Sequence, residues 1–414
     1  MVVSVSKHNT PALRFDGFDG EWNHRELNEI GTKSTVKNID AGLTETFTNS
    51  AQYGIISQLE YFDNAVSNPV NISKYSVVEP DDFVYNPRIS VTAPFGPINR
   101  NRLSRSGAMS PLYLVFKIFG VDHGFLEQFF KTDRWYDFMH LNGDVGARHD
   151  RFSIGDAKFM EMEIPTPSLQ EQRAIGELFS DLDTLIDQHR AKHTNLQQTK
   201  TALMQRMFPQ NGADEPELRL DGFSGEWQPR IMRDCAEYSK GSGYSKKDIA
   251  DEGVPVIHYG RLYTKYETAI TNVDTFATPQ LGSLISRGDE VLVPASGETA
   301  EDIAIASALL QPGVLIGGDL NVIRPRKDID PVFIALSLSN GVAKETLVKR
   351  AQGKSVVHLR NSDIQDVEIF FPALEEQRDI GEVFTNLDSL IAAEQRYITQ
   401  LTQAKTALLQ RMFV

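Results

Sequence analysis

The feature that most constrains this chain is an internal repeat, in which every clear match falls at the same offset of 205 residues. Residues 13–22 (LRFDGFDGEW) match residues 218–227 (LRLDGFSGEW) at eight of ten positions. Two further matches lie closer to the end of each copy. Residues 167–186 agree with 372–391 at thirteen of twenty positions, and residues 199–208 agree with 404–413 at eight of ten. The offset is far longer than the roughly 20 to 50 residues of a solenoid repeat, so each copy predicts a domain plus a connecting element.

The interiors of the two copies differ. The 144 residues between Trp22 and Pro167 agree poorly with the 144 residues between Trp227 and Pro372, although the lengths are equal. We therefore expect the similar parts to assemble the protein and the dissimilar parts to recognise something. Trp22 and Trp227 follow turn-forming DGF segments and are predicted to anchor the edge of each domain.

Two long amphipathic helices are predicted, because apolar residues recur three and four apart from about Gln170 to Met207 and from about Glu375 to Met412. About 40 residues at 1.5 Å rise give a rod of roughly 60 Å, too long to be covered by one small domain. The two apolar stripes are expected to bury each other, and an antiparallel pairing would place one domain at each end.

His189 and His193 lie four residues apart on one face of the first helix. This spacing could bind a metal ion, but no nearby acidic-histidine motif completes a ligand set. Because the repeat places Glu394 and Ile398 at the equivalent positions of the second helix, we favour a polar contact that sets the register of the helix pair.

The interiors predict mixed α/β domains. β-rich runs such as residues 82–85, 112–119 and 290–293 alternate with turns and with helical segments at residues 125–141 and 331–338. The predicted fold class is α+β (mixed α/β), with two pseudo-two-fold-related domains separated by a long antiparallel coiled-coil spacer. The predicted boundaries are a first domain at 1–166, a first helix at 167–208, a linker at 209–217, a second domain at 218–371 and a second helix at 372–414.

The formal net charge of −14 argues against a protein that holds nucleic acid by its overall charge, so any basic surface must be local. Residues 83–121 contain no Asp or Glu but five Arg or Lys, and residues 340–361 contain five Arg or Lys and a single acid, Glu345. Such runs are typical of either a solvated surface or a binding surface, and both interpretations remain open.

The EQR triplet recurs at the start of both predicted helices. In the first copy Ser168 and Glu171 fit a capping box, which would explain the glutamate locally. In the second copy Ala373 occupies the cap position and the triplet is nevertheless retained, so an exposed docking contact is the alternative.

Signatures of catalysis are weak. Gly353, Lys354 and Ser355 resemble the end of a phosphate loop, but Val348 stands where its first glycine should be. Asn86 and Pro87 resemble the start of an amino-methyltransferase motif, but Arg88 follows where a second proline is needed. We therefore expect no catalytic residues, no metal and no cofactor.

The compartment is also constrained by the sequence. A single cysteine, Cys235, excludes an internal disulfide. The longest apolar stretch is too short to cross a bilayer, and residues 1–10 do not read as a secretory signal, so we expect a cytoplasmic protein with no membrane partner.

Taken together, these residues resemble the specificity subunits of type I restriction-modification systems. The resemblance covers nearly the whole chain and rests on LRFxGFxGEW, PxLxEQRxIGExFxxLDxLI, KTALxQRMF and the duplication of the entire unit. Residues 241–264 and the loop 352–358 also look like parts of a target-recognition domain of that family.

The resemblance implies a non-catalytic phage-defence subunit that reads a bipartite asymmetric site in double-stranded DNA. It further implies docking of two methyltransferase subunits and, through them, restriction subunits. The residues expected to dock these partners are the two triplets, Glu171, Gln172, Arg173, Glu376, Gln377 and Arg378. The residues expected to contact DNA are Arg88, Arg100, Arg102, Arg105, Arg148, Arg151, Lys240, Lys246, Lys247, Arg261, Arg350 and Lys354.

Two other functions fit parts of the sequence. One is a helical scaffold that joins two protein-binding domains, and the other is an enzyme that modifies DNA by itself. Turnover of S-adenosylmethionine and DNA by the isolated chain would favour the enzyme, whereas co-purification with a methyltransferase subunit would favour the recognition subunit.

Overall fold

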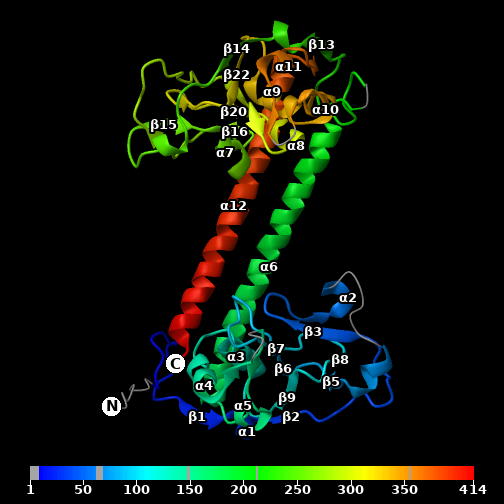
Figure 1. Cartoon of the computed structure of the whole chain (residues 1–414), viewed down its shortest axis with the longest axis vertical. Helices are drawn as coiled ribbons and strands as arrows, with labels where there is room; N and C mark the ends of the chain where they lie inside the picture. Colours follow the sequence, from blue (N-terminus) through cyan, green and yellow to red (C-terminus); the bar gives the residue numbers. More distant parts are fainter. Residues whose placement is uncertain (1–8, 62–68, 147–149, 211–212, 354–355) are drawn as a thin grey trace. The chain divides into compact units, whose positions relative to one another are not determined.

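The computed structural model of the chain describes residues 9–61, 69–146, 150–210, 213–353 and 356–414. These residues form two compact units, one made of residues 1–188 and 398–414 and the other of residues 189–397. Each unit takes part of both long helices, α6 (Leu169–Arg206) and α12 (Leu374–Met412), drawn in green and red in Figure 1. Both predicted long helices are therefore confirmed, and neither belongs to one unit alone.

The first unit contains two four-stranded sheets, one antiparallel and one mixed, and a set of short helices (Figure 1). One sheet has the order β2 (Gly31–Lys33), β9 (Leu114–Ile118), β6 (Phe83–Tyr85), β7 (Ile98–Arg100), and the other the order β4 (Gly54–Ser57), β3 (Thr46–Ser50), β8 (Gly107–Met109), β5 (Ser76–Val78). Two strand pairs, β1 (Asn23–Glu26) with β12 (Glu163–Thr166) and β10 (Asp144–Val145) with β11 (Phe152–Ser153), complete it. The helices are α1 (Leu27–Ile30), α2 (Gln58–Tyr61), η1 (Pro69–Lys74), α3 (His123–Phe129), α4 (Tyr136–Asn142) and α5 (Asp156–Phe159).

The second unit is built around a different arrangement of strands. Its main sheet has the order β14 (Ala236–Lys240), β22 (Leu320–Pro325), β18 (Glu290–Pro294), β20 (Ser307–Leu309), β16 (Ala269–Ile270), and a smaller sheet has the order β17 (Phe276–Ala277), β15 (Val254–Ile257), β21 (Leu315–Ile316). Two strand pairs join β13 (Gln228–Ile231) to β24 (Glu368–Phe371) and β19 (Ser296–Gly297) to β23 (Val357–His358). Its helices are η2 (Met232–Asp234), η3 (Lys246–Asp248), α7 (Tyr259–Thr264), α8 (Ala300–Ile303), α9 (Pro331–Leu338), α10 (Gly341–Arg350) and α11 (Asn361–Gln365).

The mixed α/β fold expected from the sequence is confirmed. The predicted helix at Pro331–Leu338 is α9, whose start is fixed by the Asp330 carboxylate accepting the Phe333 N–H and by a proline in its first turn. The prediction of one continuous helix over residues 125–141 is wrong, because the chain forms two helices there, α3 and α4, with a turn between them. The Thr132 hydroxyl and the Trp135 indole donate to the carbonyls of Phe129 and Phe130, which a continuous helix would have paired with its own backbone.

Within each unit the segments of α6 and α12 run antiparallel. In the first unit Asp183 of α6 pairs with Lys405 of α12, and Phe179 lies against Phe413 further along the same interface. In the second unit Lys200 of α6 pairs with Asp388 of α12, and Phe208 lies against Phe384. The expected contact between the apolar faces of the two helices is therefore present near the helix end in each unit, whereas Leu185 of the first predicted stripe is 39% exposed. No helix among the described residues is long and apolar enough to span a membrane.

Candidate functional site

Two identical clamps hold the start of each long helix to its domain. Arg14 donates two hydrogen bonds of 2.7 Å to the Glu171 carboxylate, and Arg219 does the same to Glu376. Both carboxylates are buried, with side chains 1% exposed. Arg14 also donates to the Gly20 carbonyl at 2.6 Å, and Arg219 donates to the Gly225 carbonyl at 2.5 Å. Each guanidinium therefore also stabilises the loop that follows the DGF segment. The hydrogen bond to Glu171 raises the pKa of Arg14 above its usual value.

The glutamine of each triplet fixes a second contact. Gln172 donates to the Pro167 carbonyl at 2.8 Å and accepts the Asp122 N–H at 2.9 Å, at the position that caps α3. Gln377 donates to the Pro372 carbonyl at 2.9 Å and accepts the Asp330 N–H at 3.0 Å, at the cap of α9. One amide therefore connects the end of a strand, the long helix and the start of a domain helix in each unit.

These contacts correct the expectation that the two EQR triplets are exposed docking residues. Glu171, Gln172, Glu376 and Gln377 are buried and bonded inside their own unit, because their polar atoms are taken up by the clamp. Half of the predicted capping box is present, since the Ser168 hydroxyl accepts the Glu171 N–H at 3.3 Å while the Glu171 carboxylate is bound to Arg14. Arg173 and Arg378 are exposed, and docking by these two stays a prediction.

Each domain also receives the end of the long helix that belongs to the other repeat. Phe413, just after α12, contacts Trp22, Phe125 and Phe179 in the first unit. Phe208, just after α6, contacts Trp227, Phe333 and Phe384 in the second. Both tryptophans are buried, which confirms their predicted structural role.

The polar contact predicted near the middle of the helices is present in the second unit. His189 Nδ1 lies 2.6 Å from Glu394 Oε2, and Lys192 Nζ lies 2.6 Å from the other oxygen of the same carboxylate. These hydrogen bonds, the one from His189 foremost, lower the pKa of Glu394. His189 and Glu394 occupy equivalent positions of the two repeats, 205 residues apart, so the two helices meet here at matching positions.

The predicted DNA-contacting residues of the first domain fall into two groups. Arg100 and Arg102 pair with the buried Glu127, and Arg105 pairs with Glu45. Arg88 and Arg151 are exposed and form no ion pair within the described part of the chain. Arg148 lies outside the described residues.

The second domain shows the same division. The Arg261 guanidinium is mostly buried between Glu267 and Asp274, at 2.8 and 2.6 Å, and Arg350 pairs with Asp366 at 3.0 Å. The lysines predicted to contact DNA are exposed and, across the ranges that the structure describes, carry no ion pair: Lys240, Lys246 and Lys247. Lys354 lies outside the described residues. Of the ten candidates that the structure describes, two arginines and three lysines therefore form no ion pair with another described residue.

The sequence analysis did not identify the residues that donate to the triplet glutamines, Asp122 and Asp330. Asp122 and Phe125 correspond to Asp330 and Phe333, each pair capping a domain helix and contacting the anchoring tryptophan. Their offset is 208 and not 205 residues, so they fall out of register with the repeat. The shared spacing Asp-x-x-Phe was the signal that could have found them. Among the described residues there is no group of three or more His, Cys, Asp or Glu side chains that could hold a metal ion.

The fold places the chain among proteins with two α/β domains and paired long helices. A solved structure described as the type I restriction-modification system S subunit from M. genitalium matches 98% of this chain and 99% of its own, with a TM-score of 0.63 and 14% identity. A second, from work on complex assembly and conformational transition of the type I R-M system, covers 95% of this chain and 97% of its own with a TM-score of 0.50 and 17% identity.

Sequence comparisons agree with the fold. Residues 224–403 match the family model described as the type I restriction modification DNA specificity domain. Two curated relatives from Methanocaldococcus jannaschii are similar: the type I restriction enzyme MjaVIII specificity subunit, 22% identical over 61% of each chain, and the putative MjaX specificity subunit, 24% identical over 62% of this chain and 60% of its own. The matches thus span about three fifths of the length of these relatives. Residues 224–403 thus match the specificity domain of type I restriction-modification systems, and the chain as a whole is similar in fold to a solved S subunit of such a system.

Proposed function

We propose that this protein is the DNA target-recognition subunit of a type I restriction-modification enzyme. Each domain reads one half of a bipartite, asymmetric site in double-stranded DNA, and the long helices fix the unspecified gap between the halves. The observation that carries this proposal is the contrast between the two units. Their clamps, tryptophan anchors and strand pairs at the helix starts are the same, while their sheets differ.

The physics of DNA recognition supports two reading domains on one scaffold. A duplex presents equivalent major-groove faces about one helical turn apart, roughly 34 Å, so a protein with two related domains can engage both. Because base edges specify and phosphates position, unlike domain interiors imply unlike half-sites. An acidic chain can serve this role when its partners supply much of the phosphate contact, and DNA binding by the isolated chain is then weak.

The DNA contacts are proposed to come from the cations identified in the sequence. The five that stand without an ion pair in the described parts of the chain, Arg88, Arg151, Lys240, Lys246 and Lys247, are the strongest candidates. Arg102 and Arg105 are paired with carboxylates, and these ion pairs would have to break before the arginines could contact DNA. Breaking them reduces the binding free energy that the DNA contact contributes.

The chain is proposed to be non-catalytic and cytoplasmic and to dock two methyltransferase subunits, with restriction subunits bound through them. Arg173 and Arg378, the exposed members of the two triplets, are proposed to contribute to that docking. Reversing both charges with Arg173→Glu and Arg378→Glu should weaken co-purification with the methyltransferase subunits. The buried clamps beside these arginines should stay folded.

The proposed function is tested by sequencing host DNA for methylated adenines with and without this gene. We expect a bipartite methylated motif that disappears when the gene is deleted. Exchanging residues 23–166 for the interior of another first domain should change one half of the motif and leave the gap and the other half unchanged. A motif that persists without the gene, or methylation by the purified chain alone, would contradict the proposal.

A further inference from the structure

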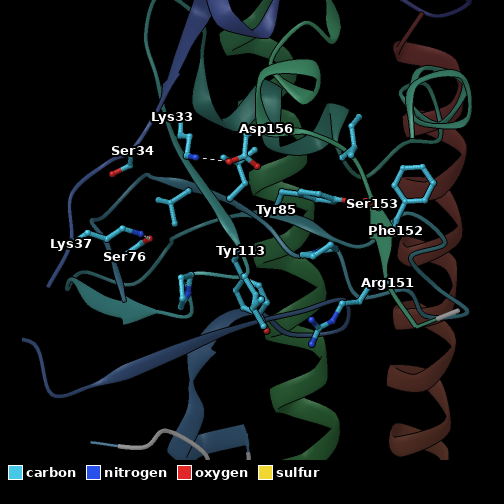
Figure 2. Close-up of a pocket in the computed structure, with 16 residues that line it drawn as sticks. Lys33, Ser34, Lys37, Ser76, Tyr85, Tyr113, Arg151, Phe152, Ser153 and Asp156 are labelled. Atoms are coloured by element: carbon cyan, nitrogen blue, oxygen red, sulfur yellow. Dashed lines mark hydrogen bonds and ion pairs between the residues drawn. The ribbon is translucent and has the colours of Figure 1, made fainter. Parts of the chain in front are cut away.

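A pocket of about 300 Å³ opens in the first domain between its two four-stranded sheets and the β10–β11 pair (Figure 2). Its lining includes three cations, Lys33, Lys37 and Arg151, and one carboxylate, that of Asp156. Lys33 Nζ lies 2.5 Å from Asp156 Oδ2, so these two charges neutralise each other. Lys37 and Arg151 remain as a net positive charge in the lining of the pocket.

Hydrogen-bond donors accompany this charge. Lys37 Nζ lies 3.0 Å from the Ser76 hydroxyl, and both side chains line the pocket (Figure 2). Ser34, another lining residue, is only 8% exposed, and its hydroxyl is buried without a hydrogen-bond partner in the structure that is described. A buried hydroxyl without a partner costs free energy, so the Ser34 side chain would gain a hydrogen bond by turning toward an acceptor bound in the pocket. The donor set is that of a site for an oxyanion.

A second observation concerns Arg151, a lining residue of the pocket, and its neighbour Arg88. Arg88 and Arg151 face each other across an isolated antiparallel bridge. Residues directly opposite in such a bridge carry their side chains on the same face, about 5 Å apart at Cβ, and like charges placed there destabilise the fold. Among the described residues neither arginine has an ion pair, although Asp150 is the neighbour of Arg151 in sequence. An anionic ligand explains why two exposed arginines are held together.

We infer that this pocket and the Arg88–Arg151 pair bind backbone phosphates of the DNA target, and so supply affinity and position but no sequence choice. The inference rests on the proposed function and assigns phosphate roles within it, adding Lys37 and Ser34 to the interface. The shape of the site favours phosphate over a base edge. A paired base edge lies at the floor of a groove and is reached by a protruding element, whereas a phosphate projects from the duplex and fits a hollow.

The experiment uses the full complex with its methyltransferase subunits. Binding of the target duplex and of a duplex with both half-sites scrambled is measured over a range of salt concentrations. Lys37→Ala and Arg151→Ala should each weaken binding of both duplexes by the same factor, roughly tenfold at low salt. Each should also reduce the slope of log K against log salt by about 0.9. Arg151→Lys keeps the charge and should keep the slope.

A matched control is Lys158→Ala, which removes a cation of the same domain that lies outside the pocket and is paired with Glu161 at 2.7 Å. It should leave both affinity and slope unchanged. The inference is overturned if the pocket variants leave the slope at its wild-type value, or if they weaken only the target duplex, which would indicate a base contact. If the wild-type complex does not prefer the target duplex at all, the proposed function fails instead.

The fold of the variants is checked by thermal unfolding of the free protein. Because Arg88→Ala and Arg151→Ala remove a repulsion between like charges, the melting temperature should stay the same or rise slightly. A clear fall in melting temperature would show that the arginines stabilise the domain, and would overturn the ligand explanation for their pairing.

Discussion

The two units of this protein hold their long helices through the same contacts and differ in the sheets of their domains. The register of the strand pair at the helix start is the same, with Asn23 opposite Thr166 and Gln228 opposite Phe371 at the 205-residue offset. Beyond these strands the first unit forms two four-stranded sheets and the second a five-stranded and a three-stranded sheet. The difference teaches that the repeat preserves contacts with the helices, while the sheet interior of each domain is free to change.

In each unit the end of a long helix is also bonded to the segment that carries the clamp arginine. In each unit the residue that precedes the arginine clamp donates to the end of a helix, Leu13 to the Arg411 carbonyl and Leu218 to the Arg206 carbonyl, both at 2.8 Å. In the second unit the helix end comes from the same repeat boundary, whereas in the first it comes from the far end of the sequence. The two hydrogen bonds are alike, but one joins residues close in sequence and the other joins residues far apart. Comparing the stability of the two units therefore separates the effect of the hydrogen bond from that of the chain connection.

The largest effect is expected from removing the phenylalanine that closes each core. Phe413→Ala and Phe208→Ala should each destabilise their unit by about 3 to 5 kcal/mol, because a buried ring against a tryptophan is replaced by a cavity. Hydrogen exchange followed by mass spectrometry should show lost protection in residues 9–146 for Phe413→Ala and in residues 228–371 for Phe208→Ala.

The control for these variants is a pair of exposed leucines at equivalent repeat positions. Leu185→Ala and Leu390→Ala should change stability by less than about 0.5 kcal/mol. If Phe413→Ala reduced protection equally in both units, the two cores would not be independent and the comparison between them would break down.

The next effect concerns the arginine clamps. Arg14→Ala and Arg219→Ala each leave a buried carboxylate without its partner, and each should cost about 3 kcal/mol in the free energy of unfolding. Denaturant titrations with Arg173→Ala and Arg378→Ala as controls would measure this. Equal losses would sharpen the comparison, whereas a loss at one clamp only would show that one domain carries a second means of attachment.

Parts of this architecture could be predicted from the sequence because they are local. The apolar spacing specifies α6 and α12 within a few residues, and the proline and Asp330 specify α9. The turn at Thr132 could not be predicted, because it depends on side chains that capture backbone carbonyls. The repeat singled out Glu171 and Glu376 but predicted that they are exposed, because it could not show that Arg14 and Glu171, 157 positions apart, meet in the fold.

The charge state of the predicted interface was equally inaccessible. Arg105 reads as a free cation in a run without acids, yet it is bound to Glu45, 60 positions away. Arg261 stands in the opening of the second domain and is mostly buried by two carboxylates. A local count of charges predicts where cations lie along the chain, but only the fold shows which of them remain without a partner.

The smallest effect is expected where the repeats meet at matching positions. His189 and Lys192 lower the pKa of Glu394, so the charged carboxylate stabilises the second unit above its usual pKa of 4.5, and this contribution is lost as the pH falls through the lowered value. The wild-type protein should therefore exceed Glu394→Gln in melting temperature at pH 5.5, and the difference should shrink toward pH 3. His189→Asn, which removes the principal partner, should flatten the same profile. If the difference in melting temperature stayed constant from pH 5.5 to 3, the charge of Glu394 would not contribute to stability. The register of the two helices would then be set by their apolar contacts.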